Sequence, residues 1–227
     1  MHQFLLAVVL ASGHPMADVA PDASALAAAM APDLQTGTLL FSKGDCLAIK
    51  VSAGGPYTHV AAVIVQDDGP VVYDSMNGVG VRKLSLDEYL STQAPDEIDL
   101  LQPCREFTPQ EALVFEAALQ QRVGSPYSVL HYILGRRAAA GVHCSEYVTD
   151  ALESIERIDV EQPPRVSPSH LHEDLVDGGI YTTARSVRFP LHPEPVEADG
   201  WCAQLWLDTK HCCWSCCDQM SAWFLCR

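Results

Sequence analysis

Two side chains far apart in the sequence, Cys144 and His59, are the strongest candidates for catalytic chemistry. Cys144 lies three residues before the stretch 147–155, whose apolar side chains recur at the spacing of a buried helix face. A thiol in the first turn of a helix lies near unpaired backbone N–H groups and the positive end of the helix dipole, and both favour the thiolate. The same N–H groups can bind an oxyanion that forms when the sulfur attacks a carbonyl. Taken alone, such a cysteine is more often a small buried apolar residue.

His59 is the candidate proton acceptor for that thiol. It lies in the apolar run 57–65, whose valines and isoleucine favour a strand in the middle of a sheet. A lone histidine in such a strand is usually a hydrogen-bonded core residue. Together with Cys144, however, it fits a known division of roles in which an imidazole takes the proton of a thiol nucleophile.

A third polar group should then fix the orientation and tautomer of the imidazole. Asp74 is the best candidate, because it lies on the strand predicted to follow the next turn. His59 and Asp74 face each other directly only if this turn centres on residues 66 and 67. A turn centred later places Asn77 or Gly78 opposite His59, so Asn77 remains an alternative for this role.

Hydrophobic spacing and turn residues predict the elements that position these side chains. Strand-forming runs dominate up to about residue 102, and helical spacing dominates between about residues 108 and 178. This segregation indicates the α+β class. The predicted strands are 38–41, 46–51, 57–65, 71–75, 79–84, 98–102 and 185–189, and the predicted helices are 85–90, 108–124, 126–134, 147–155 and 167–178.

Composition limits the classes of function. The chain has 227 residues, of which 48% are hydrophobic and 19% charged, as in a globular domain of ordinary size with extensions. Its formal net charge of -15 repels a phosphate backbone, which argues against nucleic acid as a partner. No apolar run approaches the roughly 20 residues that span a bilayer, so we expect no transmembrane segment.

The two ends of the chain differ from its middle. Residues 1–35 are interpreted as a signal-like or apolar N-terminal segment and a linker. A short apolar run followed by small residues resembles a secretory signal but lacks Lys and Arg before it, and the stretch 17–32, rich in Ala, Asp and Pro, reads as a linker or weak helix. Export and a cytoplasmic location with a docked apolar helix therefore both remain open. Residues 191–227 read as an acidic, proline-containing linker and a cysteine-rich tail. Its Cys-x-x-Cys unit at 213–216 can bind zinc, cycle as a redox pair or, after export, form disulfides.

Several motifs occur in the order found in one enzyme family. The motifs are Gly44-Asp45-Cys46-Leu47, Thr58-His59-Val60-Ala61-Ala62-Val63-Ile64, Val72-Tyr73-Asp74-Ser75, Gly124-Ser125-Pro126-Tyr127, Cys144-Ser145-Glu146-Tyr147-Val148 and Ser167-Pro168-Ser169-His170-Leu171. This combination resembles the permuted papain-like amidases of the NlpC superfamily, the YaeF/YiiX-like group.

The resemblance implies a circularly permuted papain-like domain in residues 36–190, with an antiparallel sheet packed against helices and the histidine before the cysteine. It implies Cys144 as nucleophile, His59 as base and an acidic or polar third member at Asp74, where the group often has Glu. Tyr127 is then expected close to the substrate, and neither a cofactor nor a catalytic metal is expected. The chain departs from the family pattern at Ser128, where Asp is common, and at Cys46, where an aliphatic residue is usual.

From these residues we expect a hydrolase or acyltransferase that cleaves an amide or ester through an acyl-enzyme. The resemblance implies peptide, peptidoglycan-stem or lipid-like acyl substrates without choosing among them. Two hypotheses from other classes stay open: a catalytically silent binding module on the same fold, and a metal or redox role for the cysteine-rich tail.

Overall fold

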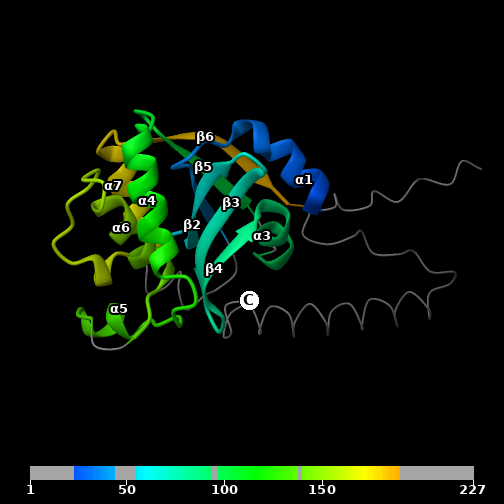
Figure 1. Ribbon diagram of the computed structural model, residues 1–227. Helices are drawn as coiled ribbons and strands as arrows, with labels where there is room; N and C mark the ends of the chain where they lie inside the picture. The colour runs from blue at the N-terminus through cyan, green and yellow to red at the C-terminus, as the bar shows by residue number, and fades with distance from the viewer. Residues whose placement is uncertain (1–22, 44–54, 94–96, 138–139, 190–227) are drawn as a thin grey trace, which may run out of the picture.

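A six-stranded antiparallel sheet forms the centre of the computed structural model, which describes residues 23–43, 55–93, 97–137 and 140–189 (Figure 1). The strand order is β4-β3-β2-β1-β5-β6. Together with its helices, the sheet makes the fold α+β, as the sequence predicts. The strands are β1 (Leu39–Lys43), β2 (Tyr57–Gln66), β3 (Gly69–Met76), β4 (Gly80–Ser85), β5 (Glu97–Pro103) and β6 (Tyr181–Arg188).

The hairpin of β2 and β3 confirms the strongest strand prediction. Gln66 pairs with Gly69, so the turn consists of Asp67 and Asp68, and Gly69 adopts a φ of 126° that a residue with a Cβ rarely adopts. Side chains of β2 alternate between two cores, and both sets are buried. β2 is therefore covered on both faces, which explains why its sequence is almost continuously apolar.

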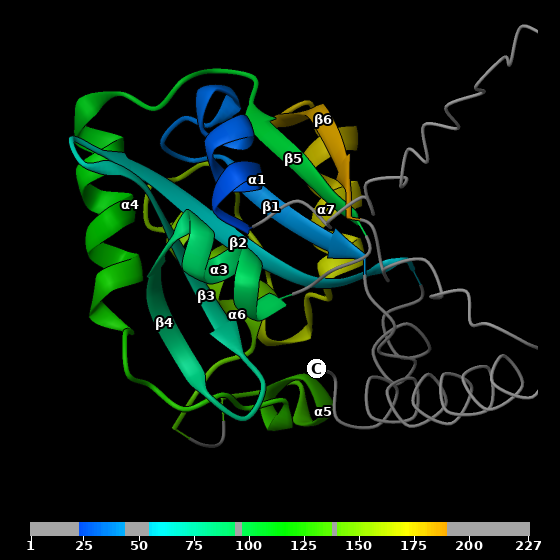
Figure 2. The same ribbon diagram turned by 90° about the vertical axis from the view of Figure 1, so that its right-hand side faces the viewer.

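Helices cover both faces of the sheet. One layer contains α4, α6 and α7, and the opposite layer contains α1 and α3 (Figures 1 and 2). This arrangement places the predicted histidine strand between two helical layers. The helices are α1 (Ala23–Met30), α3 (Leu86–Gln93), α4 (Pro109–Gln121), α5 (Leu130–Leu134), α6 (Cys144–Glu153) and α7 (Pro168–Asp177), with short 3-10 turns at Ala31–Asp33 and Pro163–Arg165.

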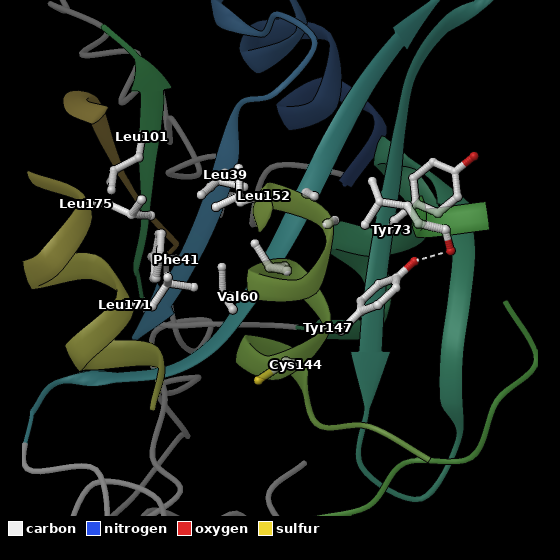
Figure 3. Close-up of a cluster of buried hydrophobic side chains, with 14 of the residues drawn as sticks. Leu39, Phe41, Val60, Tyr73, Leu101, Cys144, Tyr147, Leu152, Leu171 and Leu175 are labelled. Atoms are coloured by element: carbon white, nitrogen blue, oxygen red, sulfur yellow. Dashed lines mark hydrogen bonds between the residues drawn. The ribbon is translucent and has the colours of Figure 1, made fainter. Parts of the chain in front are cut away.

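The larger core lies between the sheet and the layer of α6 and α7. Figure 3 shows Leu152 of α6 beside Leu39 of β1 and Leu171 of α7 near Val60 of β2, with Cys144 at the first turn of α6. Tyr147 is also buried, and its hydroxyl donates to the backbone oxygen of Leu119 at 2.7 Å. These contacts fix the start of α6 relative to the sheet.

The packed domain begins earlier than the predicted boundary at residue 36. The helix α1 lies within the stretch 1–35, which we interpreted as a signal-like segment and linker, and its Met30 is fully buried against the α3 layer. Its alanine-rich sequence gives a weak helical period, which is why the sequence did not reveal this packing. The predicted strand 46–51 and the tail 191–227 lie outside the described residues.

The predicted helix 126–134 is wrong at its start. Tyr127 forms a parallel β-bridge with Val142, and the Val142 N–H donates to the Pro126 oxygen at 3.1 Å. This pairing holds residues 126–128 extended, so α5 begins only at Leu130. Its end is as predicted, because Gly135 caps it in the left-handed conformation, with φ 65°.

Candidate active site

Cys144 is the first residue of α6, and its thiol is buried. The preceding residue, His143, has extended backbone angles and caps the helix, since its ring accepts a hydrogen bond from the Glu146 N–H. The Tyr147 N–H binds the His143 oxygen at 2.9 Å. Because a helix cannot pair the N–H groups of its first residues internally, those of Cys144 and Ser145 remain available beside the sulfur.

His59 and Asp74 lie on neighbouring strands and meet diagonally. The register pairs Asp74 with Ala61, so His59 is two residues away on the same face of β2. His59 Nε2 lies 3.2 Å from Asp74 Oδ2, although this oxygen is off the line of the N–H bond, so the contact is an ion pair rather than an aligned hydrogen bond. With Nε2 turned to the carboxylate, Nδ1 is the ring nitrogen left for the thiol of Cys144.

Arg82, on β4, holds the other side of the Asp74 carboxylate. The two residues are direct partners in the β3–β4 register, and Arg82 donates from Nε to Oδ1 at 2.9 Å and from a terminal nitrogen to Oδ2 at 2.7 Å. Burial opposes the charged form of Asp74, but the close contact with His59 and the hydrogen bonds and charge of Arg82 outweigh it and lower the pKa of Asp74. Asp74 therefore stays ionised although it is fully buried.

The thiol and the imidazole stabilise each other as an ion pair. Burial alone would raise the pKa of Cys144, but the positive charge of His59 and hydrogen bonds from His143 and His59 lower it to about 5. Burial likewise would lower the pKa of His59, but the charge of Cys144 and the contact with Asp74 raise it to about 10. Between these two values the pair is a thiolate and an imidazolium.

His143 is a second imidazole next to the thiol, and it has a different role. The Glu146 N–H donates to its Nδ1, which leaves the ring proton on Nε2, 3.0 Å from the Pro164 oxygen. Nδ1 also lies 3.1 Å from Ser145 Oγ. Burial would lower the pKa of His143, but the hydrogen bond and the charge of Cys144 raise it, so this ring contacts the thiol as well as the helix start. His59 differs from it in having a carboxylate partner suited to stabilising an imidazolium. The geometry favours His59 as the base.

Tyr89 closes the site from the α3 layer. Its ring stacks over the His59 imidazole, with centroids 6.5 Å apart and planes inclined by 27°, and it is fully buried. Its hydroxyl lies 3.5 Å from Ser42 Oγ, at the outer limit of a hydrogen bond. Burial, followed by the nearby charge of Asp74, raises the pKa of this phenol, so it stays neutral.

A pocket opens beside the sulfur of Cys144. Aromatic and aliphatic side chains make up most of its wall, which therefore suits an apolar part of a substrate better than a charged one. Burial, and then the charge of Cys144, raises the pKa of Tyr127, which stays a neutral phenol in this wall. The lining residues are Thr58, Tyr127, Val129, Tyr132, His143, Cys144, Ser145, Val166, Ser167 and Pro168.

The structure thus brings together four of the five site residues expected from the sequence: Cys144, His59, Asp74 and Tyr127. Asn77 is placed differently, because it lies exposed in the turn between β3 and β4. Sequence reasoning missed three further residues near the site. Arg82 and Tyr89 follow from pairing and packing of the predicted strand and helix, and the position of His143 directly before the Cys144 helix marks it as a cap.

A buried carboxylate fixes the wall of this pocket. Glu146 is fully buried one turn into α6, and its oxygens lie 3.0 Å from His131 Nδ1 and 3.1 Å from Arg137 Nε. His131 belongs to α5, and Arg137 lies in the segment that follows it. Glu146 therefore ties α5, whose flanking residue Val129 lines the pocket, to the helix that carries Cys144.

Replacing Glu146 with glutamine should destabilise the fold by about 2 kcal/mol, because the amide has a single acceptor oxygen and cannot keep the contacts of the buried carboxylate with both His131 and Arg137. The free energy of unfolding can be measured by urea titration. Glu173→Gln, the same change at an exposed position in α7, serves as the control and should change it by less than about 0.5 kcal/mol. Equal stability of the two variants would contradict this role of Glu146.

The thiolate state of Cys144 should be visible in its alkylation by iodoacetamide. With a pKa of about 5, its rate should be nearly constant between about pH 6 and pH 8. An ordinary thiol, with a pKa of about 8.5, should react roughly tenfold faster per pH unit over this range. The exposed Cys104 provides this internal comparison, and peptide mass spectrometry separates the two sites. Parallel pH profiles at both cysteines would show that Cys144 is only a core residue.

Comparisons with known proteins give little further information. No protein-family model matches the chain, and no curated protein matches it. Among solved structures, the chain is similar to the crystal structure of metalloprotein YiiX from Escherichia coli O157:H7, with a TM-score of 0.45 and 15% sequence identity over 74% of this chain and 98% of that one. Within the described part of this chain, no three His, Cys, Asp or Glu side chains are grouped to hold a metal ion. No helix there is long and apolar enough to cross a membrane.

Proposed function

We propose that this chain is a cysteine-dependent hydrolase or acyltransferase that cleaves an amide or ester bond through an acyl-enzyme on Cys144. The observation that supports it most is that the buried side chains of Cys144, His59 and Asp74 follow one another in space, with His59 between the other two. This is the order needed for a nucleophile, its base and the group that orients the base. A circularly permuted papain-like domain over residues 36–190, extended upstream by α1, fits an antiparallel sheet whose histidine strand precedes the cysteine helix.

The reaction begins with the Cys144 thiolate, which attacks the carbonyl carbon of the substrate. The carbonyl oxygen becomes an oxyanion, and the free N–H groups of Cys144 and Ser145 at the start of α6 are suited to bind it. The His59 imidazolium donates its Nδ1 proton to the departing amine or alcohol, the bond to the leaving group breaks, and the acyl group remains as a thioester on Cys144.

The second half regenerates the enzyme. His59, now neutral, takes a proton from water or from another acceptor, whose oxygen or nitrogen attacks the thioester carbon. The thiolate of Cys144 departs, and the acid, or the transferred acyl product, leaves the site. Asp74 stabilises the imidazolium at both stages, because it is held ionised and within 3.2 Å of Nε2.

The pocket wall bears on the substrate class. Peptides, peptidoglycan stems and lipid-like acyl compounds remain the candidates, with Tyr127 in contact with the acyl part. The aromatic and aliphatic lining, which includes Val129, Tyr132 and Val166, favours an apolar acyl group over a charged one.

Intact-mass measurement after incubation with p-nitrophenyl esters of acids of different chain length tests the proposal. The expected result is a mass increase of one acyl group that maps to Cys144, together with release of p-nitrophenol. Cys144→Ala should show neither. A wild-type protein that forms no adduct with any of these esters, and whose Cys144 also resists iodoacetamide, would instead be a catalytically silent binding module.

A further inference from the structure

The short helix α5 and the residue before it expose a concentrated apolar surface. Within the described residues, eight large hydrophobic side chains are exposed, and four of them lie in the stretch 129–134. These four, Val129, Leu130, Ile133 and Leu134, are between 45% and 65% exposed, and we call them the α5 patch. His131, on the inner side of α5, is held by Glu146, so the helix is fixed with its apolar side outward.

Two arginines without an acidic partner in the described residues lie beside the α5 patch, although the chain as a whole is acidic. The protein contains 29 Asp and Glu residues and carries a net charge of -15, yet residues 117–145 contain no acidic residue and three arginines. Arg136 directly follows α5 and is exposed, and Arg165 is exposed and in contact with Gly135 at the end of α5. In the described part of the chain, neither guanidinium forms an ion pair, whereas Arg137 is neutralised by Glu146 and Asp150.

The α5 patch adjoins the pocket beside Cys144. Val129 belongs to both surfaces, and Tyr132, on the same helix, lines the pocket. An apolar chain bound at the α5 patch therefore lies next to the entrance of the space in front of the sulfur. Because Glu146 connects α5 to α6, this relation is fixed rather than adjustable.

We propose that the α5 patch docks the protein on the surface of an anionic phospholipid bilayer. Aliphatic side chains on one face of a helix, flanked by arginines, are the combination that inserts at the boundary between head groups and acyl chains of anionic membranes. A second protein fits less well, because a stable protein interface buries about 800 Å² and 20–30 residues on each side, whereas this patch offers four apolar side chains.

Docking on the membrane does not depend on the proposed reaction at Cys144. It requires only the α5 patch, Arg136 and Arg165, and none of the catalytic side chains. One consequence does rest on the proposed function: a docked protein presents the Cys144 pocket to the membrane surface, so the acyl donor would be an amphiphile such as a lipid ester or amide.

Co-sedimentation of the full-length protein with phospholipid vesicles tests the docking. The protein should bind vesicles of phosphatidylcholine mixed with phosphatidylserine, bind vesicles of phosphatidylcholine alone more weakly, and lose affinity as salt is added. Ile133→Ser should lower the partition coefficient roughly tenfold, since one large aliphatic side chain no longer enters the lipid. Leu113→Ser is the matched control, because Leu113 in α4 is as exposed as Ile133, at 65% each, and should leave binding unchanged.

A second pair of variants tests the charge. Arg136→Gln should weaken binding to the anionic vesicles severalfold without changing binding to phosphatidylcholine alone, and Arg188→Gln, on the distant edge strand β6, should change neither. Equal effects of Ile133→Ser and Leu113→Ser, or no binding of the wild-type protein to anionic vesicles, would overturn the proposal.

Two further results separate the alternatives. Self-association that increases with protein concentration and disappears in Ile133→Ser, without vesicle binding, would assign the patch to an interface between copies of the chain and overturn docking. Cys144→Ala should bind vesicles like the wild type. A protein that binds vesicles as expected but forms no acyl adduct would refute the proposed function while supporting the docking.

Discussion

Replacing His59 with alanine should reduce turnover almost as much as replacing Cys144 with alanine, by at least about 10³-fold. His59 both holds the thiolate, through its positive charge, and supplies the proton for the leaving group. Members of one catalytic unit are not additive, so the double variant should be no slower than either single variant. Release of p-nitrophenol from an acyl ester measures turnover, and circular dichroism confirms that each variant is folded.

Two other histidines provide controls for this comparison. His170 is exposed on α7, and His170→Ala should keep full activity. His143 lies beside the sulfur, but asparagine can replace its ring as a helix cap. His143→Asn should therefore stay folded and lose no more than about tenfold in turnover. Complete inactivity of His143→Asn, with an active His59→Ala, would transfer the base role to His143.

The sequence predicted which residues lie near each other better than it predicted how they meet. The turn at Asp67 and Asp68 fixes a register in which Asp74 faces Ala61, not His59 as the simplest pairing required. The two side chains still meet, because they are diagonal neighbours on one face of adjacent strands, and such pairs are within reach of long side chains. A shift of one residue would have turned Asp74 to the opposite face.

Other features depend on contacts that no local pattern encodes. Arg82 holds Asp74 only because the short turn after β3 brings β4 back in direct register. The helix predicted from residue 126 starts late, because Val142, far along the chain, pairs with Tyr127. Met30 is buried by packing against the α3 layer, although its own helix has little amphipathic pattern. Each of these three features depends on a tertiary contact, which overrides or adds to the local preference of the sequence for helix or strand.

Asp74→Asn should reduce turnover by about 10²- to 10⁴-fold while leaving Cys144 present and alkylatable. The change removes the negative charge that stabilises the imidazolium, so the pKa of His59 should fall. A less stable imidazolium supports the thiolate less well, so the pKa of Cys144 should rise. The pH range in which the thiolate–imidazolium pair exists should therefore narrow at both ends. A pH profile of alkylation at Cys144 measures the lower end of this range, where the thiolate becomes protonated.

The same change affects stability, because it leaves the Arg82 guanidinium largely buried without its carboxylate partner. We expect a loss of about 3 kcal/mol in the free energy of unfolding. The double variant Asp74→Asn with Arg82→Gln removes both charges and should recover part of that stability without recovering turnover. Recovery of both would mean that Asp74 matters for folding alone.

Asn77→Ala decides between the two candidates for the third role. Asn77 lies exposed in the turn between β3 and β4, whereas His59 Nε2 faces the buried Asp74. Its replacement should change turnover by less than about twofold, within the range of ordinary surface substitutions. Near-normal turnover in Asp74→Asn together with a collapse in Asn77→Ala would move the orienting role to Asn77. Because Asp74 is fully buried, ionised and 3.2 Å from His59 Nε2, we expect the reverse.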